Sequence, residues 1–379
     1  MTKLDELIQE LCPDGVEFVS MNELLKRKQI STITPTIKVK RNDYLDIGET
    51  PIISQEIEYI SGYCNFHDKN IPCGNYVCFG DHSEHIKYIN FSFVQGADGL
   101  KIMRTNESTI SSRYLFHALS SKYQRHNNYE RHFKYLTDTI IPVPPLPVQR
   151  EIVRILDNFT ELTAELTAEL TARKKQYAYY RDKLLTFGDV RGGATSDVIR
   201  RTLGEVCKIS AGGDAPKDSM SKQKTEKYSV PIISNGIGEN ALYGYTDAPK
   251  VEEPAVTVAA RGTIGYAEYR DYPFYPIIRL LTAIPKDSTV VNTKYLYYCL
   301  QGKQYSVPMG GIPQLTAPEL KKVEIPIPSL DVQNRIVQVL DNFDAICTDL
   351  SSGLPAEIEA RQKQYEYYRD KLLSFEEKI

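Results

Sequence analysis

The sequence predicts an α+β protein in which two similar α/β domains alternate with two long helices, as a pseudo-two-fold internal repeat. Three observations predict this fold. Residues 148–159 recur almost unchanged at 332–343, and residues 173–185 recur at 361–373. Short apolar segments broken by Gly, Pro, Asn and Asp precede each copy, as expected for strands and turns. These short segments also share anchors, such as 51–54 and 231–234. A repeat this long indicates a duplicated structural unit.

The bulk composition is that of an ordinary globular protein. The chain has 379 residues and a net charge of −3, so any nucleic-acid surface must be a local patch. No stretch of 18 apolar residues is present, so no membrane span is expected. The seven cysteines have irregular spacing, which favours reduced thiols and a cytoplasmic location.

The first domain is expected over residues 1–145. It begins with a helix at 3–11, which Pro13 and Gly15 end. Strands are predicted near 52–54, 76–79 and 100–103, and a helix at 112–121. The proline-rich run 139–145 then keeps the chain extended.

Residues 146–188 are predicted as a long helical spacer. Its apolar residues recur about every 3.5 positions, which is the spacing of a coiled-coil seam. A helix of about 40 residues is roughly 60 Å long, which favours a spacer or a partner-binding rod. The middle of this helix repeats the unit Thr-Ala-Glu-Leu. Four residues are close to one helical turn, so adding or deleting a unit changes mainly the length. A linker is expected at 188–194.

The second half replays the first, with a domain at 189–329 and a helical segment at 330–379. Gly353 and Pro355 are predicted to kink or break the second long helix. The helix at 3–11 has no full counterpart in the second half. We therefore expect it to pack near the end of the second long helix.

The repeated motifs carry a specific resemblance. They are Pro-Leu-Pro-Val-Gln-Arg-Glu-Ile-Val at 145–153, Ile-Pro-Ser-Leu-Asp-Val-Gln-Asn-Arg-Ile at 327–336, two Leu-Asp-Asn-Phe motifs and two Tyr-Tyr-Arg-Asp-Lys-Leu-Leu motifs. With residues 12–16 and 261–265, this pattern resembles the specificity subunit (S, HsdS) of type I restriction–modification enzymes over essentially the whole chain. The Thr-Ala-Glu-Leu repeats resemble the type IC branch of that family.

The resemblance implies a fold and a set of partners. Each α/β domain would be a target recognition domain that reads one half of a bipartite double-stranded DNA site. The long helices would pack antiparallel, hold the two domains apart and bind two methyltransferase subunits. Restriction subunits would join through the complex of two methyltransferases with this chain. S-adenosylmethionine, ATP and Mg²⁺ would belong to those partners. The chain itself would be non-catalytic, with no cofactor and no metal.

Candidate DNA contacts are the cationic, amide and aromatic side chains of the domain loops, because groove-reading groups must project from the scaffold. The strongest cluster is 122–129 with Arg131 and His132, and the candidates earlier in the first domain, His85 among them, are weaker. In the first domain the candidates are Lys38, Lys40, Arg41, Lys69, His82, Lys87, Lys122, Arg125, Asn127 and Arg131. In the second domain they are Lys217, Lys222, Lys224, Lys227, Arg261 and Gln314.

Apolar and aromatic residues of the long helices are the candidates for partner contact. Their helical spacing favours packing against another helix or a subunit over DNA contact. They are Phe159, Leu162, Leu166, Leu170, Tyr177, Tyr180, Phe343, Tyr365 and Tyr368.

Other motifs give weaker evidence, in this case for a metal, nucleotide or catalytic site. Cys64, His67, Cys73 and Cys78 lie close in sequence, but their spacing fits no common zinc site. The glycines at 236 and 238 formally match a dinucleotide fingerprint, yet no helix is predicted after them. The Pro-Pro pair at 144–145 lacks the flanking residues of an adenine methyltransferase. Two alternatives stay open: a self-contained methyltransferase or nuclease, and a coiled-coil scaffold without DNA selectivity.

Overall fold

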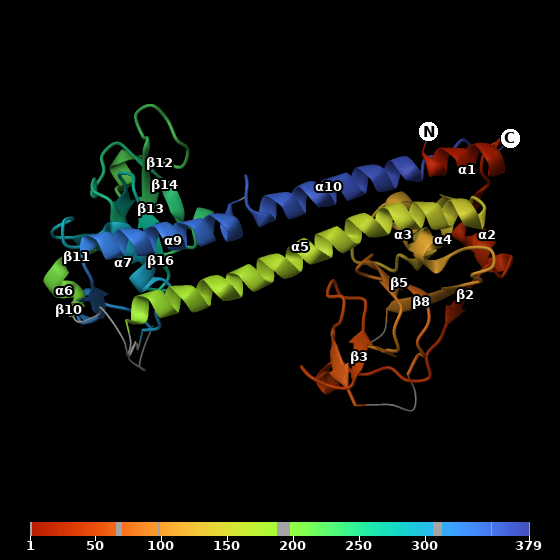
Figure 1. Ribbon diagram of the computed structural model, residues 1–379, viewed down its shortest axis with the longest axis horizontal. Coiled ribbons are helices and arrows are strands. Elements are labelled where there is room, and N and C mark those ends of the chain that lie inside the picture. The colour runs from red at the N-terminus through yellow and green to blue at the C-terminus, as the bar shows by residue number, and fades with distance from the viewer. Residues whose placement is uncertain are drawn as a thin grey trace. The chain divides into compact units, whose positions relative to one another are not determined.

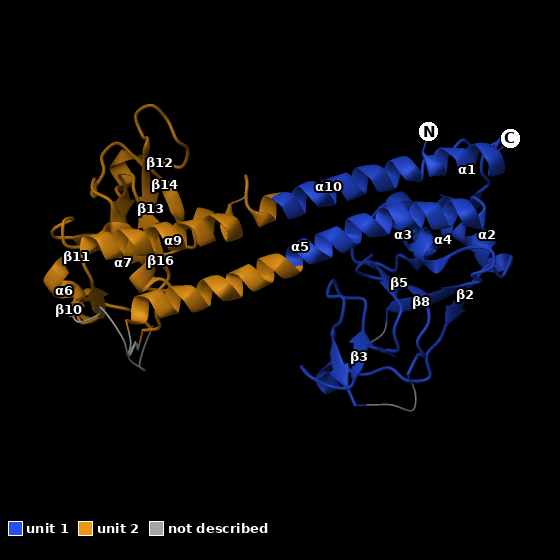
Figure 2. Cartoon of the chain, in the orientation of Figure 1, with its two compact units in different colours: residues 1–167, 357–379 blue, residues 168–356 orange. Residues whose placement is uncertain are grey.

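The computed structural model describes residues 2–65, 70–96, 99–187, 198–305, 313–349 and 351–378. Figure 2 shows two compact units, of which unit 1 holds residues 1–167 and 357–379, and unit 2 holds residues 168–356. Both chain termini therefore belong to unit 1. Within the described ranges, no helix is long and apolar enough to cross a membrane.

Unit 1 contains three sheets, which Figure 1 labels in part. The largest is antiparallel, with the order β2-β8-β5-β6. A three-stranded sheet has the order β4-β3-β7, and β1 pairs with β9. The strands are β1 (Phe18–Ser20), β2 (Ile30–Ile33), β3 (Thr50–Ile53), β4 (Gly62–Cys64), β5 (Tyr76–Gly80), β6 (Ile86–Ile89), β7 (Val94–Gln95), β8 (Leu100–Thr105) and β9 (Ile140–Pro142).

Short helices connect these strands. They are α1 (Lys3–Leu11), α2 (Met21–Lys26), α3 (Ser112–Lys122), α4 (Phe133–Asp138) and the 3₁₀ turn η1 (Arg41–Asp43). The helices predicted at 3–11 and 112–121 are confirmed. A capping box between Thr2 and Asp5 begins α1, because the side chains satisfy N–H groups that have no partner inside a helix.

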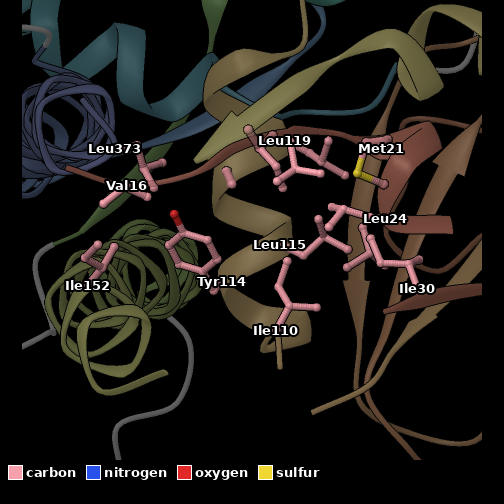
Figure 3. Close-up of a cluster of buried hydrophobic side chains, with 14 of the residues drawn as sticks. Val16, Met21, Leu24, Ile30, Ile110, Tyr114, Leu115, Leu119, Ile152 and Leu373 are labelled. Atoms are coloured by element: carbon pink, nitrogen blue, oxygen red, sulfur yellow. The ribbon is translucent and has the colours of Figure 1, made fainter. Parts of the chain in front are cut away.

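The main core of unit 1 lies around α3. In Figure 3, Tyr114 of α3 points toward Ile152 of the long helix and toward Leu373, near the C-terminus. Apolar residues of α1 belong to the same cluster, together with Leu372, Leu373 and Phe375. The backbone also joins the two ends, since Val16 donates to the Glu376 carbonyl at 2.9 Å and accepts from Lys378 at 3.0 Å. The expected packing of α1 near the end of the second long helix is confirmed.

Unit 2 repeats the sheets of unit 1. Its antiparallel sheet has the order β11-β18-β15-β16, and the second sheet, β12-β14-β13-β17, adds the short strand β12. The strands are β10 (Ile199–Thr202), β11 (Cys207–Ala211), β12 (Met220–Ser221), β13 (Val230–Ile233), β14 (Leu242–Thr246), β15 (Ala255–Val258), β16 (Ala267–Arg270), β17 (Tyr275–Pro276), β18 (Leu281–Pro285) and β19 (Glu324–Ile327). The helices and turns are α6 (Leu203–Val206), η2 (Lys217–Ser219), η3 (Gly238–Ala241), α7 (Thr293–Leu300) and α8 (Ala317–Lys321).

The long helices differ between the two copies. The first copy is one helix, α5 (Leu146–Thr186), which agrees with the predicted span. The second copy is divided into α9 (Leu330–Thr348) and α10 (Leu354–Leu372), so the predicted break is confirmed. At the break, a Cβ on Gly353 would lie 2.7 Å from the carbonyl oxygens of Ala345 and Asp349. Pro355 falls in the first turn of α10, where a missing N–H costs nothing. The linker predicted at 188–194 lies outside the described residues.

Candidate DNA interface and helix contacts

In unit 1, the carboxylate of Glu84 connects two loops by hydrogen bonds. It lies in the turn between β5 and β6 (turn 80–85) and accepts hydrogen bonds from residues of the segment after α3 (loop 123–132). The donors are the Tyr123 hydroxyl at 2.6 Å and the backbone N–H groups of His126 and Asn127 at 2.8 Å each. Glu84 and Asn127 both have a positive φ. This strain of about 1–3 kcal/mol per residue persists because the hydrogen bonds fix both loops.

The electrostatics of Glu84 follow from these contacts. Burial of the carboxyl opposes its ionisation, but the hydrogen bonds from Tyr123, His126 and Asn127 outweigh burial and lower the pKa to about 2. Glu84 is therefore a carboxylate at any physiological pH.

Loop 123–132 gathers several of the predicted DNA contacts on one surface. Arg125 donates to His85 at 3.0 Å, and the His82 ring stacks on Tyr129 with centroids 5.1 Å apart. Tyr129 itself is 91% exposed, and Arg125, Asn127 and Arg131 are also exposed. Turn 80–85 and loop 123–132 therefore present cationic, amide and aromatic groups together.

Unit 2 has the corresponding turn between β15 and β16 (turn 259–265). Arg261 donates from two nitrogens to Gln314 Oε1, at 3.0 and 2.6 Å. Gly262 and Gly265 have positive φ values, 71° and 87°, which glycine adopts without strain. Arg261 and Gln314, predicted separately from the sequence, thus form one exposed pair.

One amide residue holds the turn in each unit. In unit 1, Gln55 accepts from the His82 N–H at 3.1 Å and from the Ser83 hydroxyl. In unit 2, Asn235 accepts from the Ala260 N–H at 2.8 Å and from the Thr263 hydroxyl at 2.8 Å. The sequence reading missed these roles, although both residues follow the shared anchor at the end of β3 and β13.

Asn235 also binds the loop that carries Arg279. Its amide donates to the carbonyl of Ile278, and Ile278 and Arg279 have positive φ values of 53° and 63°. Arg279 is exposed, and its guanidinium makes no ion pair with the part of the chain that the structure describes. The sequence did not point to this arginine, because nothing about an Ile or an Arg indicates that it will adopt a positive φ.

The remaining basic candidates are dispersed. Lys38 and Lys40 are exposed near η1, where Arg41 pairs with Glu56. In unit 2, Lys222 donates to the Tyr243 carbonyl at 2.9 Å, and Lys217, Lys224 and Lys227 are exposed. Lys122 ends α3, beside Asp370 of α10. Lys69 lies outside the described residues.

Lys87 has a structural position instead of the surface position expected of a DNA contact. It is 5% exposed, and its ammonium donates to the carbonyls of Ser54, at 3.0 Å, and Glu58. Burial lowers its pKa. A phosphate has no access to this group, so we leave Lys87 out of the interface.

The zinc arrangement considered from the sequence is not formed by the cysteines that the structure describes. Cys64 and Cys78 are buried, whereas Cys73 is exposed and donates to the Asn90 carbonyl. His67 lies outside the described residues. After the glycines at 236 and 238 the chain forms η3 and strand β14, without the helix that a dinucleotide site needs.

The motifs at the start of each long helix have a structural role. The Gln149 amide accepts from the Ser111 N–H at 2.9 Å and donates to the carbonyls of Thr109 and Pro144. Gln333 makes the same three hydrogen bonds with Asn292, Val290 and Pro328. Both glutamines are completely buried. Each fastens the start of its long helix to the α/β domain of its unit.

The aspartates of the two Leu-Asp-Asn-Phe motifs also correspond. Asp157 pairs with Arg113 at 2.8 Å and lies 3.1 Å from His117. Asp341 pairs with Lys294 at 2.8 Å and accepts from Tyr298.

Most of the predicted partner-contact residues pack within the chain. Tyr365 lies 3.0 Å from His117 Nδ1, and Tyr177 donates to Gln301 at 2.6 Å. Phe159, Phe343, Tyr180 and Tyr368 form two stacked pairs. Leu162, Leu166 and Leu170 are half-buried. Tyr179 and Tyr367, which occupy equivalent positions of the repeat, are 60% and 62% exposed, and the sequence reading did not single them out.

Comparisons with known proteins agree with this architecture. The family described as type I restriction modification DNA specificity domain matches residues 13–173 and 196–360. The EcoR124I/EcoR124II specificity subunit of Escherichia coli is 30% identical, and the match covers 99% of this chain and 97% of that protein. A Mycoplasma pneumoniae protein named as a type I specificity subunit is 35% identical over 76% of this chain and 90% of its own length.

Solved structures show the same fold. The crystal structure of the S subunit of a type I restriction–modification system from M. genitalium aligns with a TM-score of 0.59 at 13% identity. That alignment covers 95% of this chain and 96% of the other. The predicted α+β fold with two recognition domains is confirmed, and the chain belongs to the family of type I restriction–modification specificity subunits.

Proposed function

We propose that each unit of this specificity subunit reads one half of a bipartite DNA site. The reading groups lie around turn 80–85 and loop 123–132 in unit 1, and around turn 259–265 in unit 2. The observation that carries the proposal is a contrast within the repeat. The buried hydrogen bonds of Gln149 recur at Gln333, whereas the turns carry unlike groups, the buried carboxylate of Glu84 in one and the exposed guanidinium of Arg261 in the other. A duplicated scaffold whose turns carry different side chains is suited to reading two different DNA sequences.

The exposed groups have the chemistry of base readout. Arginine can donate two hydrogen bonds to guanine, and asparagine or glutamine can pair with adenine in the major groove. Unit 2 offers Arg261, Gln314 and Arg279, and unit 1 offers Arg125 and Asn127. Lys38, Lys40, Lys217, Lys224 and Lys227 suit phosphate contacts, which position a protein without reading sequence.

The two-fold repeat supports two copies of one partner. Tyr179 and Tyr367 are exposed at equivalent positions, and a similar surface that occurs twice suits two methyltransferase subunits. Those subunits would carry S-adenosylmethionine, and restriction subunits that use ATP and Mg²⁺ would join the resulting complex. The Thr-Ala-Glu-Leu units of α5 support the type IC branch. The expected cytoplasmic location follows from the chromosomal DNA substrate.

Methylome sequencing tests this function directly. Cells expressing the chain with its methyltransferase partner should show adenine methylation at one bipartite motif with a fixed spacer. Arg261→Ala should change the methylated bases in one half-site and leave the other half-site unchanged. A continuous motif, or methyl transfer by the purified chain alone, would overturn the proposal.

A further inference from the structure

Three possible metal ligands converge in unit 1. His126 Nδ1 lies 3.4 Å from one Glu84 oxygen, and His132 Nε2 lies 3.6 Å from the other. The three ligand atoms all lie within 4.8 Å of one another, and this is the one such group among the described residues. We infer that Glu84, His126 and His132 bind one divalent transition-metal ion, of which Zn²⁺ is the representative, and that the ion locks loop 123–132 onto turn 80–85.

The distances favour a shared ion over direct pairing. Hydrogen bonds between nitrogen and oxygen are usually about 2.7–3.2 Å long, so both separations are longer than a good hydrogen bond. Zinc bonds of about 2.0–2.1 Å in a tetrahedron place neighbouring donor atoms roughly 3.3 Å apart. The observed 3.4 and 3.6 Å, which end on different oxygens of Glu84, are each near that edge length.

The ligand chemistry also suits such an ion. Two imidazoles and one carboxylate are a known zinc ligand set that leaves a fourth position open. The Glu84 carboxyl is ionised, and it is 3% exposed. Asn128 Oδ1 lies 2.6 Å from His132 Nε2, a hydrogen-bond distance that is too short for two ligands of one tetrahedral ion, so the fourth position is left to a water. The Asn128 amide nitrogen donates to Glu130 at 2.9 Å, which turns its oxygen toward the histidine.

The surrounding contacts fix both histidine rings. His132 is completely buried, and its other nitrogen, Nδ1, lies 3.1 Å from the Asp81 carbonyl. A metal-bound histidine commonly donates its second N–H to such an oxygen, which sets the tautomer. The His126 ring stacks on Tyr135, with centroids 4.0 Å apart and planes 20° apart. The proton that His132 Nε2 shares with Asn128 would leave when the ion binds, so binding weakens in acid.

The internal repeat predicts the stoichiometry. The equivalent turn of unit 2 has Arg261 bonded to Gln314, and a guanidinium repels a cation. One ion per chain is therefore expected. The ion would add to an existing attachment of the loop, because Glu84 also accepts hydrogen bonds from Tyr123, His126 and Asn127. This inference is independent of the proposed function, since it concerns metal binding in the absence of DNA.

Titration of the tag-free, full-length chain tests the site. After treatment with a chelator, the chain is titrated with Zn²⁺ by calorimetry and with Co²⁺ by visible absorption. We expect one ion per chain at roughly micromolar free metal, Co²⁺ bands without a thiolate band, and a higher Tm with Zn²⁺. His126→Gln should weaken binding by roughly tenfold or more and remove the Tm shift.

His82→Gln is the matched control, because His82 lies beside the same loop and contacts Tyr129 and the Glu130 carbonyl, neither of which is a proposed ligand. It should bind Zn²⁺ like the wild type. His126→Gln keeps the backbone N–H that Glu84 accepts, so the variant should fold, which circular dichroism checks. No stoichiometric binding by the wild type, equal binding by His126→Gln, or a thiolate band from Co²⁺ would each overturn the inference.

Discussion

Phe159 of α5 stacks on Tyr368 of α10, with ring centroids 5.3 Å apart and planes 19° apart. Phe343 of α9 and Tyr180 of α5 repeat this contact in unit 2, at 5.8 Å and 27°. Both phenylalanines end a Leu-Asp-Asn-Phe motif, and both tyrosines belong to a Tyr-Tyr-Arg-Asp motif. Each front motif therefore packs against the back motif of the other copy, which explains why the two motifs recur as a pair.

The stacked pairs should contribute to stability. Replacing Phe159 and Tyr368 with leucine, singly and together, should give a coupling free energy of about 0.5–1.5 kcal/mol, as for other aromatic pairs. Urea unfolding of the four proteins measures it. The pair Phe159 and Tyr367 is the control, since Tyr367 is more exposed and should show no coupling to Phe159. Coupling near zero for the stacked pair would mean that these rings serve a partner subunit instead.

Gln333 should be essential to the attachment of α9. Gln333→Leu leaves the Asn292 N–H and the carbonyls of Val290 and Pro328 without their partner. Buried polar groups that lose a hydrogen bond cost about 1–3 kcal/mol each, and three groups are affected, so we expect a loss of about 3 kcal/mol or more in the free energy of unfolding. Gln338→Leu, at an exposed position of the same helix, should change stability little. Similar unfolding curves for the two variants would contradict this role.

Unit 1 should lose stability in mild acid through His117. Burial lowers the pKa of His117, against the opposing effect of its hydrogen bond to Asp157. The folded pKa lies below the unfolded value of about 6.5, so protonation favours the unfolded chain. This contribution is complete above that value and falls as pH drops below it.

His117→Gln removes the titrating group, so the decline in stability as pH falls below about 6.5 should become shallower. Unit 2 offers the comparison, because Tyr298 occupies the equivalent position and burial raises its pKa. Thermal unfolding at a series of pH values measures the effect. An unchanged slope in His117→Gln would show that other groups control the acid response.

Arg279 should lower the stability of the fold and strengthen DNA binding. Its positive φ costs about 1 kcal/mol or more, so Arg279→Gly should raise the free energy of unfolding by about 1 kcal/mol while weakening DNA binding by about 1–3 kcal/mol. Ile278→Gly removes the same kind of strain without removing a charge, and its DNA binding should stay unchanged. Denaturant unfolding and fluorescence anisotropy measure the two effects. Equal DNA affinities for both variants would exclude Arg279 from the interface.

The sequence predicted the scaffold better than the site, for a physical reason. Repeats, caps and helix breakers such as Gly353 act locally, so α1, α3, α5 and the division between α9 and α10 follow from spacing and residue type. The site depends on pairs that are distant in sequence. Glu84 and His126 are brought together by the turn, and the ammonium of Lys87 is buried by neighbouring carbonyls. A lysine looks the same in sequence whether it faces solvent or a carbonyl, so only the fold separates Lys87 of β6 from Lys40.

Deleting residues 163–166 should shorten the spacer between the half-sites. The deletion removes one Thr-Ala-Glu-Leu unit, about 6 Å of helix with roughly 40° of rotation, which corresponds to one or two base pairs at about 3.4 Å each. The helix should close without a defect. Thr163 donates to the Phe159 carbonyl and Thr167 to the Thr163 carbonyl, so after the deletion Thr167 stands four residues from Phe159 and can take over that bond.

The half-sites themselves should not change, because turns 80–85 and 259–265 are distant in sequence from the deletion. Insertion of one further Thr-Ala-Glu-Leu unit at the same place is the matched control and should lengthen the spacer by the same amount. Methylome sequencing of cells expressing each variant with the methyltransferase partner gives both quantities at once. A change in the length of α5 alone leaves the base-reading groups intact. Altered half-sites with an unchanged spacer would therefore show that α5 does not set the distance between the half-sites.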